Sequence, residues 1–179
     1  MTMKKKTCLK DSRGFTLIEL IVVIAIISIL SVGTLLGASV LGHGNAKSAT
    51  GRIKSLLDNV RIENMTKKEP YYLLISQVNN NYNLTIQTVK DGHRVDKASE
   101  KLDIRKGKIS FLITDGSSYI VSSEPIEGNV NELELTFNKE TGELVEYVSG
   151  KWVKAITVES GNRLYNIHLV RATGKAYID

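Results

Sequence analysis

One long uncharged run constrains what this chain can form more than any other feature. Residues 20–42 contain no Asp, Glu, Lys or Arg and are rich in Ile, Leu and Val. A helix of these 23 residues is about 35 Å long, and the hydrocarbon core of a bilayer is about 30 Å thick. We therefore expect residues 15–44 to form a transmembrane helix.

A basic segment precedes this run. Residues 1–14 contain five basic residues and one acidic residue, which account for most of the formal net charge of +5. Because basic residues flank the cytoplasmic end of a span, we expect the N-terminus in the cytoplasm and the chain after residue 44 on the outer side. Ordinary secretion fits less well, since the apolar run is longer than that of a removable signal peptide. Gly44-Asn45-Ala46 resembles a signal-peptide cleavage site only weakly.

Glu19 is the one carboxylate near the start of the apolar run. A charge near the bilayer centre costs about 2.5–3.5 kcal/mol on insertion scales, so such residues are usually paired and functional. A cut before Phe15 would create a positive amine one helical turn from Glu19, or within reach of Glu19 in a neighbouring copy. The alternative is that Glu19 lies at the headgroup level of an uncut signal anchor.

The sequence GFTLIEL, at residues 14–20, resembles the class III signal of type IV pilins and type II secretion pseudopilins. The resemblance implies that prepilin peptidase cuts between Gly14 and Phe15 and methylates the new amine of Phe15. It also implies three further partners: other pilin or pseudopilin subunits, an assembly-platform membrane protein and membrane lipid. In an assembled filament, Glu19 would pair with the Phe15 amine of an adjacent subunit and set the axial register.

Residues 45–69 have apolar side chains at three- and four-residue steps, separated by charged ones. This pattern predicts an amphipathic helix that continues the transmembrane helix. Its expected apolar positions are Ala46, Ala49, Ile53, Leu56, Leu57, Val60 and Met65. Pro70 should end the helix near residues 67–69.

After Pro70 the pattern changes to short β-branched and aromatic runs separated by turn signals. It predicts an antiparallel sheet over residues 70–179, packed on the apolar face of the helix. The expected strands are residues 71–78, 82–89, 102–104, 108–114, 118–122, 132–138, 144–148, 152–158, 163–171 and 176–178. Residues 90–101 are expected to form a polar loop. The expected fold class is α+β and pilin-like.

A second resemblance concerns this β region. Residues 59–74, the sequence LTFNKETGEL at 135–144 and residues 156–178 are similar to the globular domain of GspH/FimT-type minor pseudopilins. Gly142, Thr173 and Gly174 occupy the positions of turn residues in that domain. The resemblance implies a minor rather than a major subunit.

The remaining candidate sites are sparse. Cys8 is the only cysteine and lies in the leader, so the exported part would have no disulfide. His43, His93 and His168 are far apart in the sequence, and their spacing does not match a metal site. The chain lacks nucleotide-binding and nucleophile motifs, so we expect no cofactor and no enzymatic activity.

Arg163, Arg171 and Lys175 lie near the end of the chain, with Tyr165 and Tyr177 between them. Such a patch could contact the phosphates of DNA, although a solvated sheet face explains it more simply. Two functions therefore stay open. The first is a filament subunit processed at Gly14 and Phe15, and the second is a signal-anchored protein whose outer β domain binds a ligand or partner.

Overall fold

The structure is a computed structural model that describes residues 17–102, 104, 107–124 and 127–179, with the side chains of residues 29–44 left out. The fold is α+β. The chain divides into two units, Met1–Ala38 and Ser39–Asp179, and helix α1 (Leu17–Thr66) contributes to both. The predicted cleavage site at Gly14 and Phe15 lies outside the described residues.

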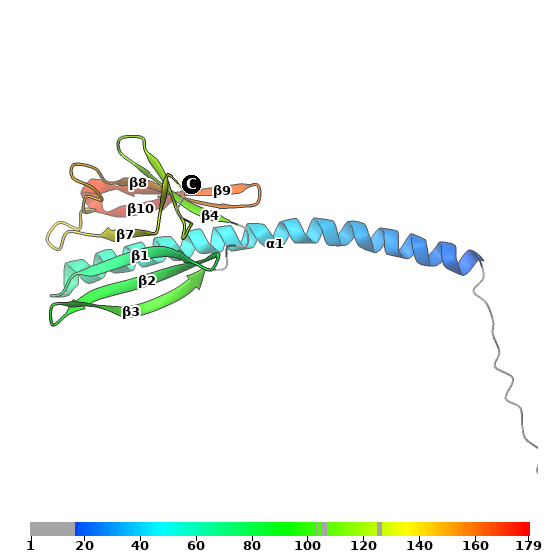
Figure 1. Ribbon diagram of the computed structural model, residues 1–179, viewed down its shortest axis with the longest axis horizontal. Coiled ribbons are helices and arrows are strands. Elements are labelled where there is room, and N and C mark those ends of the chain that lie inside the picture. Colours follow the sequence, from blue (N-terminus) through cyan, green and yellow to red (C-terminus); the bar gives the residue numbers. More distant parts are fainter. Residues whose placement is uncertain (1–16, 103, 105–106, 125–126) are drawn as a thin grey trace, which may run out of the picture. The chain divides into compact units, whose positions relative to one another are not determined.

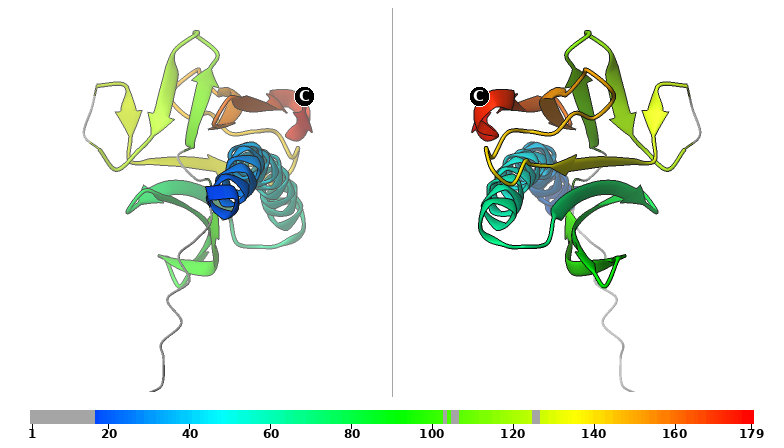
Figure 2. Two further views of the ribbon diagram at one scale, coloured as in Figure 1. Left: turned by 90° about the vertical axis from the view of Figure 1, so that its right-hand side faces the viewer. Right: turned by 90° about the vertical axis from the view of Figure 1, so that its left-hand side faces the viewer.

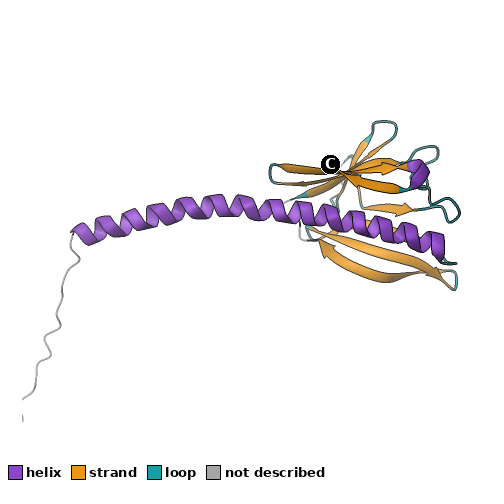
Figure 3. Cartoon of the chain, turned by 180° about the vertical axis from the view of Figure 1, so that it is seen from behind, coloured by secondary structure: helices purple, strands orange, loops and turns teal. Residues whose placement is uncertain are grey.

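The first unit is described from the start of α1. Each side chain of residues 17–28 is exposed, and Figure 3 shows this part of the chain as helix. Among the residues whose side chains are described, no helix is both long and apolar enough to cross a membrane.

In the second unit, one stripe of α1 is buried. Six of the seven predicted apolar positions are confirmed: five are buried, namely Ala46, Ala49, Ile53, Leu57 and Val60, and Leu56 is partly buried. Met65 is 43% exposed, so its place in that face was wrongly predicted. The helix ends at Thr66, a residue before the expected stop, and Pro70 follows the turn after it.

A four-stranded antiparallel sheet contains β1 (Tyr71–Val78), β2 (Asn81–Lys90), β3 (His93–Leu102) and β7 (Glu132–Thr136), in the order β3-β2-β1-β7. Asn79 and Asn80 join β1 to β2 with φ of 50° and 61°. Two positive φ values are typical of the tight turn that matches the twist of a hairpin. The predicted hairpin is therefore confirmed.

A six-stranded sheet has the order β10-β9-β8-β4-β5-β6. Its strands are β4 (Lys108–Ile113), β5 (Ser118–Val121), β6 (Asn129–Val130), β8 (Val153–Ser160), β9 (Arg163–Val170) and β10 (Lys175–Ile178), and the short 3-10 helix η1 (Arg171–Thr173) joins the last two. Figures 1 and 2 show both sheets beside the second part of α1, and residues of all three form one hydrophobic core.

The prediction of one antiparallel sheet was wrong in two respects. There are two sheets, because β7 pairs with β1, about sixty residues earlier, rather than with a strand that follows it. In addition, β5 and β6 pair in parallel. A sequence pattern of strands and turns gives strand positions but does not give pairing partners across long separations.

Residues 90–101 are not a loop. Asp91 and Gly92 form a turn with φ of 51° and 80°, and β3 follows it and pairs with β2 along its length. The side chains at residues 93–99 are all exposed. Because β3 is an edge strand held by backbone hydrogen bonds, it needs no alternation of apolar and polar residues, which is why its sequence reads as a loop.

Residues 144–148 were predicted as a strand, but they form only isolated bridges. The Leu144 N–H donates to Arg171 O, whereas the Val145 N–H donates to Thr136 O. Consecutive residues are thus bonded to different segments, and no continuous ladder can form.

Tyr82 connects the two sheets. It is 1% exposed, its hydroxyl donates to Val121 O, and it accepts a bond from the Ile109 N–H, both at 3.0 Å. Burial raises the pKa of this phenol, and the bond from Ile109 offsets part of the effect. The phenol therefore ties β2 to β4 and to the end of β5.

Candidate functional site

The start of α1 is apolar on every side. Its large side chains are more than half exposed at most positions, with Leu17 at 78% and Ile18 at 69%. A monomeric soluble protein rarely exposes a contiguous apolar surface of this kind, and such surfaces mark contacts with protein or membrane. This surface therefore needs a partner from outside the described chain.

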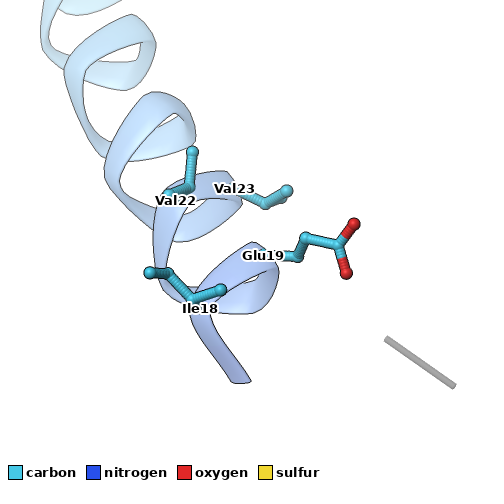
Figure 4. A pocket seen from close by; sticks show the side chains of 4 residues that line it. All are labelled: Ile18, Glu19, Val22 and Val23. Carbon is cyan, nitrogen blue, oxygen red and sulfur yellow. The ribbon is translucent and has the colours of Figure 1, made fainter. Parts of the chain in front are cut away.

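Glu19 is the only charged side chain in residues 17–28. With Ile18, Val22 and Val23 it lines a shallow hollow, and Figure 4 shows its carboxylate extending outward beside Val23. Residues three and four positions apart share a helix face, so the carboxylate projects from a valine-lined surface. Its predicted partner, the Phe15 amine, lies outside the described residues, and the pairing stays a prediction.

The predicted basic cluster is not gathered in the structure. Arg163 begins β9, whereas Arg171 and Lys175 lie beyond its other end. Eight extended residues span about 27 Å. Moreover, the Arg171 guanidinium stacks 4.3 Å from the ring centre of Trp152 and lies 3.4 Å from Glu146. The length of β9 therefore separates Arg163 from the other two basic residues, and contact with nucleic acid stays an untested prediction.

The histidines are dispersed as well. His93 begins β3 and His168 lies in β9, while the side chain of His43 is not described. His168 Nε2 is 2.9 Å from Asp179 Oδ2, and this contact lowers the pKa of the carboxyl group of Asp179. In the described part of the chain, no three His, Cys, Asp or Glu residues are placed to hold a metal ion.

The turn glycines Gly142 and Gly174 meet in the structure. Both have positive φ, and a Cβ on Gly174 would lie 2.1 Å from Gly142 O. Arg61 of α1 donates to the same carbonyl at 3.3 Å. The two turns thus pack against each other and against the helix, and only glycine leaves room for this approach at Gly174.

Asn64 is a structural residue that the sequence reasoning missed. It is 3% exposed, its side-chain amide donates to Tyr71 O at 2.8 Å, and its Oδ1 accepts from the Tyr71 N–H at 2.9 Å. These bonds fix the connection from α1 to β1 around Pro70. The available signal was a polar side chain four residues after Val60, in the buried stripe.

Comparisons with known proteins gave one match. The family model of the prokaryotic N-terminal methylation motif matches residues 9–35. No curated protein and no solved structure matches the chain. The matched range includes Gly14, Phe15 and Glu19 together with the exposed apolar part of α1. This motif implies processing by prepilin peptidase and assembly with other pilin subunits, and it indicates a type IV pilin-like, structural protein that is made as a prepilin.

Proposed function

We propose that the chain is a minor pilin or pseudopilin, a structural subunit of a type IV pilus or of a type II secretion-like filament. One observation carries the proposal: the methylation motif at residues 9–35 includes residues 17–28 of α1, where the exposed side chains are nearly all apolar and Glu19 is the one carboxylate. A helix that is apolar all round must be buried, in lipid or among other helices.

In this proposal the leader, residues 1–14, is removed on the cytoplasmic face, and residues 15–44 hold the subunit in the cytoplasmic membrane. Residues 45–69 continue the helix outside, and the chain after them forms the β-sheet domain. The assembly platform would then move the subunit into the filament. Extraction from lipid is possible only if neighbouring helices bury the same apolar surface, because exposing it costs about 25 cal/mol per Å².

Glu19 would provide the register of that assembly. In the filament core it would accept hydrogen bonds from the methylated Phe15 amine of an adjacent subunit. Removing one partner of a buried ion pair typically costs about 3–5 kcal/mol, because the other charge is left uncompensated. The carboxylate would therefore favour one axial position over its neighbours.

We further propose that the second unit is a GspH/FimT-type domain, which makes the protein a minor subunit. The contact between the turns of Gly142 and Gly174 supports this, since it gives a packing reason for glycines at the positions that the resemblance singles out.

The N-terminus of the mature protein tests the proposal directly. Mass spectrometry of the protein from cells should find a chain that begins at N-methylated Phe15. A chain that keeps Met1 would contradict it and would favour the signal-anchored protein.

Assembly is tested by Glu19→Ala. We expect this variant to be inserted and cleaved normally but to be lost from sheared filaments. Asp58→Ala is a suitable control, because Asp58 is also a carboxylate on α1 and lies in the second unit, 2.6 Å from Lys54. Normal incorporation of Glu19→Ala would show that the carboxylate does not set the register.

A further inference from the structure

The strands at the edges of the two sheets are not equally protected. β3 carries five charged residues, β6 has only two residues, and β7 accepts a hydrogen bond at Thr136 O from the Val145 N–H. Charge, short length and cover by another segment are common ways to keep an edge strand from pairing with a second chain. The remaining edge strand, β10, has the uncharged middle Ala176, Tyr177 and Ile178, and Figure 2 shows it at the outer side of the molecule.

Only one side of the β10 backbone is bonded to β9. The two strands pair antiparallel, and the Asp179 N–H donates to Asn166 O at 3.2 Å. Because hydrogen bonding alternates along an antiparallel pair, Tyr177 and Asp179 bond to β9. The N–H and C=O groups of Ala176 and Ile178 point away from β9, and they have no hydrogen-bond partner among the described residues. The outer side of β10 therefore presents a short row of donors and acceptors.

One face of β10 carries two opposite charges with an aromatic ring between them. Lys175, Tyr177 and Asp179 alternate along the chain, so their side chains lie on the same face of the sheet. Tyr177 is 54% exposed, and Lys175 and Asp179 are exposed as well. Asp179 Oδ2 lies 2.9 Å from His168 Nε2, and this contact holds the carboxylate on that face.

This arrangement is complementary to a second copy of itself. When two β10 strands pair antiparallel with Tyr177 opposite Tyr177 of the second copy, Ala176 lies opposite Ile178 of the second copy. The outward backbone groups of the two strands then face each other in hydrogen-bonded positions. In the same register Lys175 lies opposite Asp179 of the second copy, and the two-fold symmetry forms this ion pair twice. A shift by two residues in either direction would lose both ion pairs.

We propose that β10 pairs antiparallel with β10 of a second copy of this chain, so that the two six-stranded sheets become continuous. Facing pairs of opposite charge and of aromatic rings stabilise antiparallel strands. Such a contact uses the same surface on both copies and closes on itself, so it cannot propagate into a filament. In the proposed function it belongs to subunits outside the filament, and it must open before assembly. The inference itself does not depend on that function, because it rests only on the edge of the sheet.

Disulfide formation between two copies tests the contact. Cys8 is the only cysteine, so in a Cys8→Ser background an added cysteine is the single thiol of the full chain. Tyr177→Cys places two thiols at the symmetric position, where facing Cα atoms are about 4.5 Å apart and within the range of a disulfide bond. The purified chain is oxidised with diamide in detergent, and nonreducing electrophoresis measures the dimer.

Leu164→Cys is the matched control for this experiment. Leu164 is 55% exposed, like Tyr177, but it lies on β9 and outside the proposed contact. We expect the dimer to form about tenfold faster with Tyr177→Cys, because pairing of the strands raises the effective concentration of the two thiols.

Two further changes, each combined with Tyr177→Cys, separate strand pairing from random collision. Ile178→Pro removes an outward N–H but no bond to β9, so it should slow dimer formation to the rate of Leu164→Cys. Lys175→Glu places like charges opposite each other at both ends of the contact and should slow dimer formation about fivefold. Adding Asp179→Lys to Lys175→Glu exchanges the two charges and should restore the rate. A loss of folding would not be reversed in this way.

Equal rates for Tyr177→Cys and Leu164→Cys would overturn the proposal. A rate that neither Ile178→Pro nor Lys175→Glu lowers would also overturn it, as would a charge exchange that fails to restore the rate. The same holds if Tyr177→Cys links in cells only to a different protein. A mature chain that keeps Met1 but still forms the Tyr177→Cys dimer would remove the proposed filament function and leave the contact in place.

Discussion

The two parts of α1 have the same backbone geometry but opposite surroundings. In residues 17–28 the described side chains are all exposed, although nearly all are apolar. In the second unit the helix buries Ile53, Leu57 and Val60 completely and turns residues such as Arg52 and Ser55 to solvent. The side chains of residues 17–28 are thus exposed in the described part of the chain, whereas the second part is covered by two sheets of the same chain.

This difference follows from the spacing of apolar residues. In the second part, polar residues separate the apolar ones so that one stripe faces the sheets. In the first part the apolar residues are continuous, and a helix of this kind must be surrounded. The stability of the second part therefore comes from packing within this chain, while in the proposed function lipid or neighbouring subunits surround the first part.

Truncating one leucine in each part gives the largest expected contrast. Leu57 is fully buried, so Leu57→Ala should lower the free energy of unfolding of the second unit by about 2–5 kcal/mol. Leu20 is 57% exposed, so Leu20→Ala should leave that free energy unchanged. Denaturant titration in detergent, followed by the fluorescence of the single tryptophan, Trp152, measures both. Similar losses in the two variants would mean that the two parts are not independent.

The turns of Gly142 and Gly174 pack against each other and against α1, and this contact predicts the next largest loss of stability. An alanine at Gly174 would adopt a left-handed conformation, at about 1–2 kcal/mol, and its Cβ would overlap Gly142 O, at about 1–3 kcal/mol more. Gly150→Ala is the control, since Gly150 has a similar φ of 73° but open space around it. Thermal unfolding should therefore show a larger loss for Gly174→Ala. Equal losses would show that the turns move apart freely.

Tyr82→Phe tests whether the two sheets enclose the helix as one structure. It removes the hydroxyl between Val121 O and the Ile109 N–H, and an unsatisfied buried group costs about 1–3 kcal/mol. Tyr177→Phe should have almost no effect, because Tyr177 is 54% exposed.

The same phenol predicts a response to pH. Because burial raises the pKa of Tyr82, the stability that this residue contributes is present below a pH of about 10 and is lost as the pH rises through the raised pKa of the folded state. Denaturant midpoints of both variants at neutral pH and near pH 11 would check this; a pH response that Tyr82→Phe leaves unchanged would contradict it.

The parts of the fold that the sequence predicted are those set by local pattern. The period of Ile53, Leu57 and Val60 identified the buried face, and the asparagines after Val78 identified the first hairpin. The strand β3 was missed because its position depends on backbone pairing with β2 and not on burial. The division into two sheets was missed because it depends on the pairing of β1 with β7, which leaves no local signal.

The candidate site shows the same contrast between local sequence signals and contacts that form only after folding. Gly14, Phe15 and Glu19 form a contiguous motif, so the sequence alone indicated them, and the family model matches the same segment. Arg163, Arg171 and Lys175 were grouped by sequence proximity, and an intervening strand separates them. The contact of Arg52 with Glu100 required the opposite relation, since residues far apart in sequence come together only after β3 folds back along α1.

The smallest effect is expected for Asp115, an exposed residue far in sequence from either part of α1. The bond from Lys151, at 2.8 Å, lowers the pKa of the Asp115 carboxyl group to about 2, with a smaller contribution from the Ser117 N–H. Because the pKa is lower in the folded state, the ion pair contributes stability above pH of about 4 and loses it as the pH falls towards 2. Asp115→Asn keeps an oxygen for Ser117 but removes the charge, so its denaturant midpoint should lie slightly below that of the unmodified chain at pH 7, and this difference should shrink as the pH falls to 2. A difference of the same size at both pH values would show that the charge on Asp115 contributes nothing, and that the substitution acts through the turn alone.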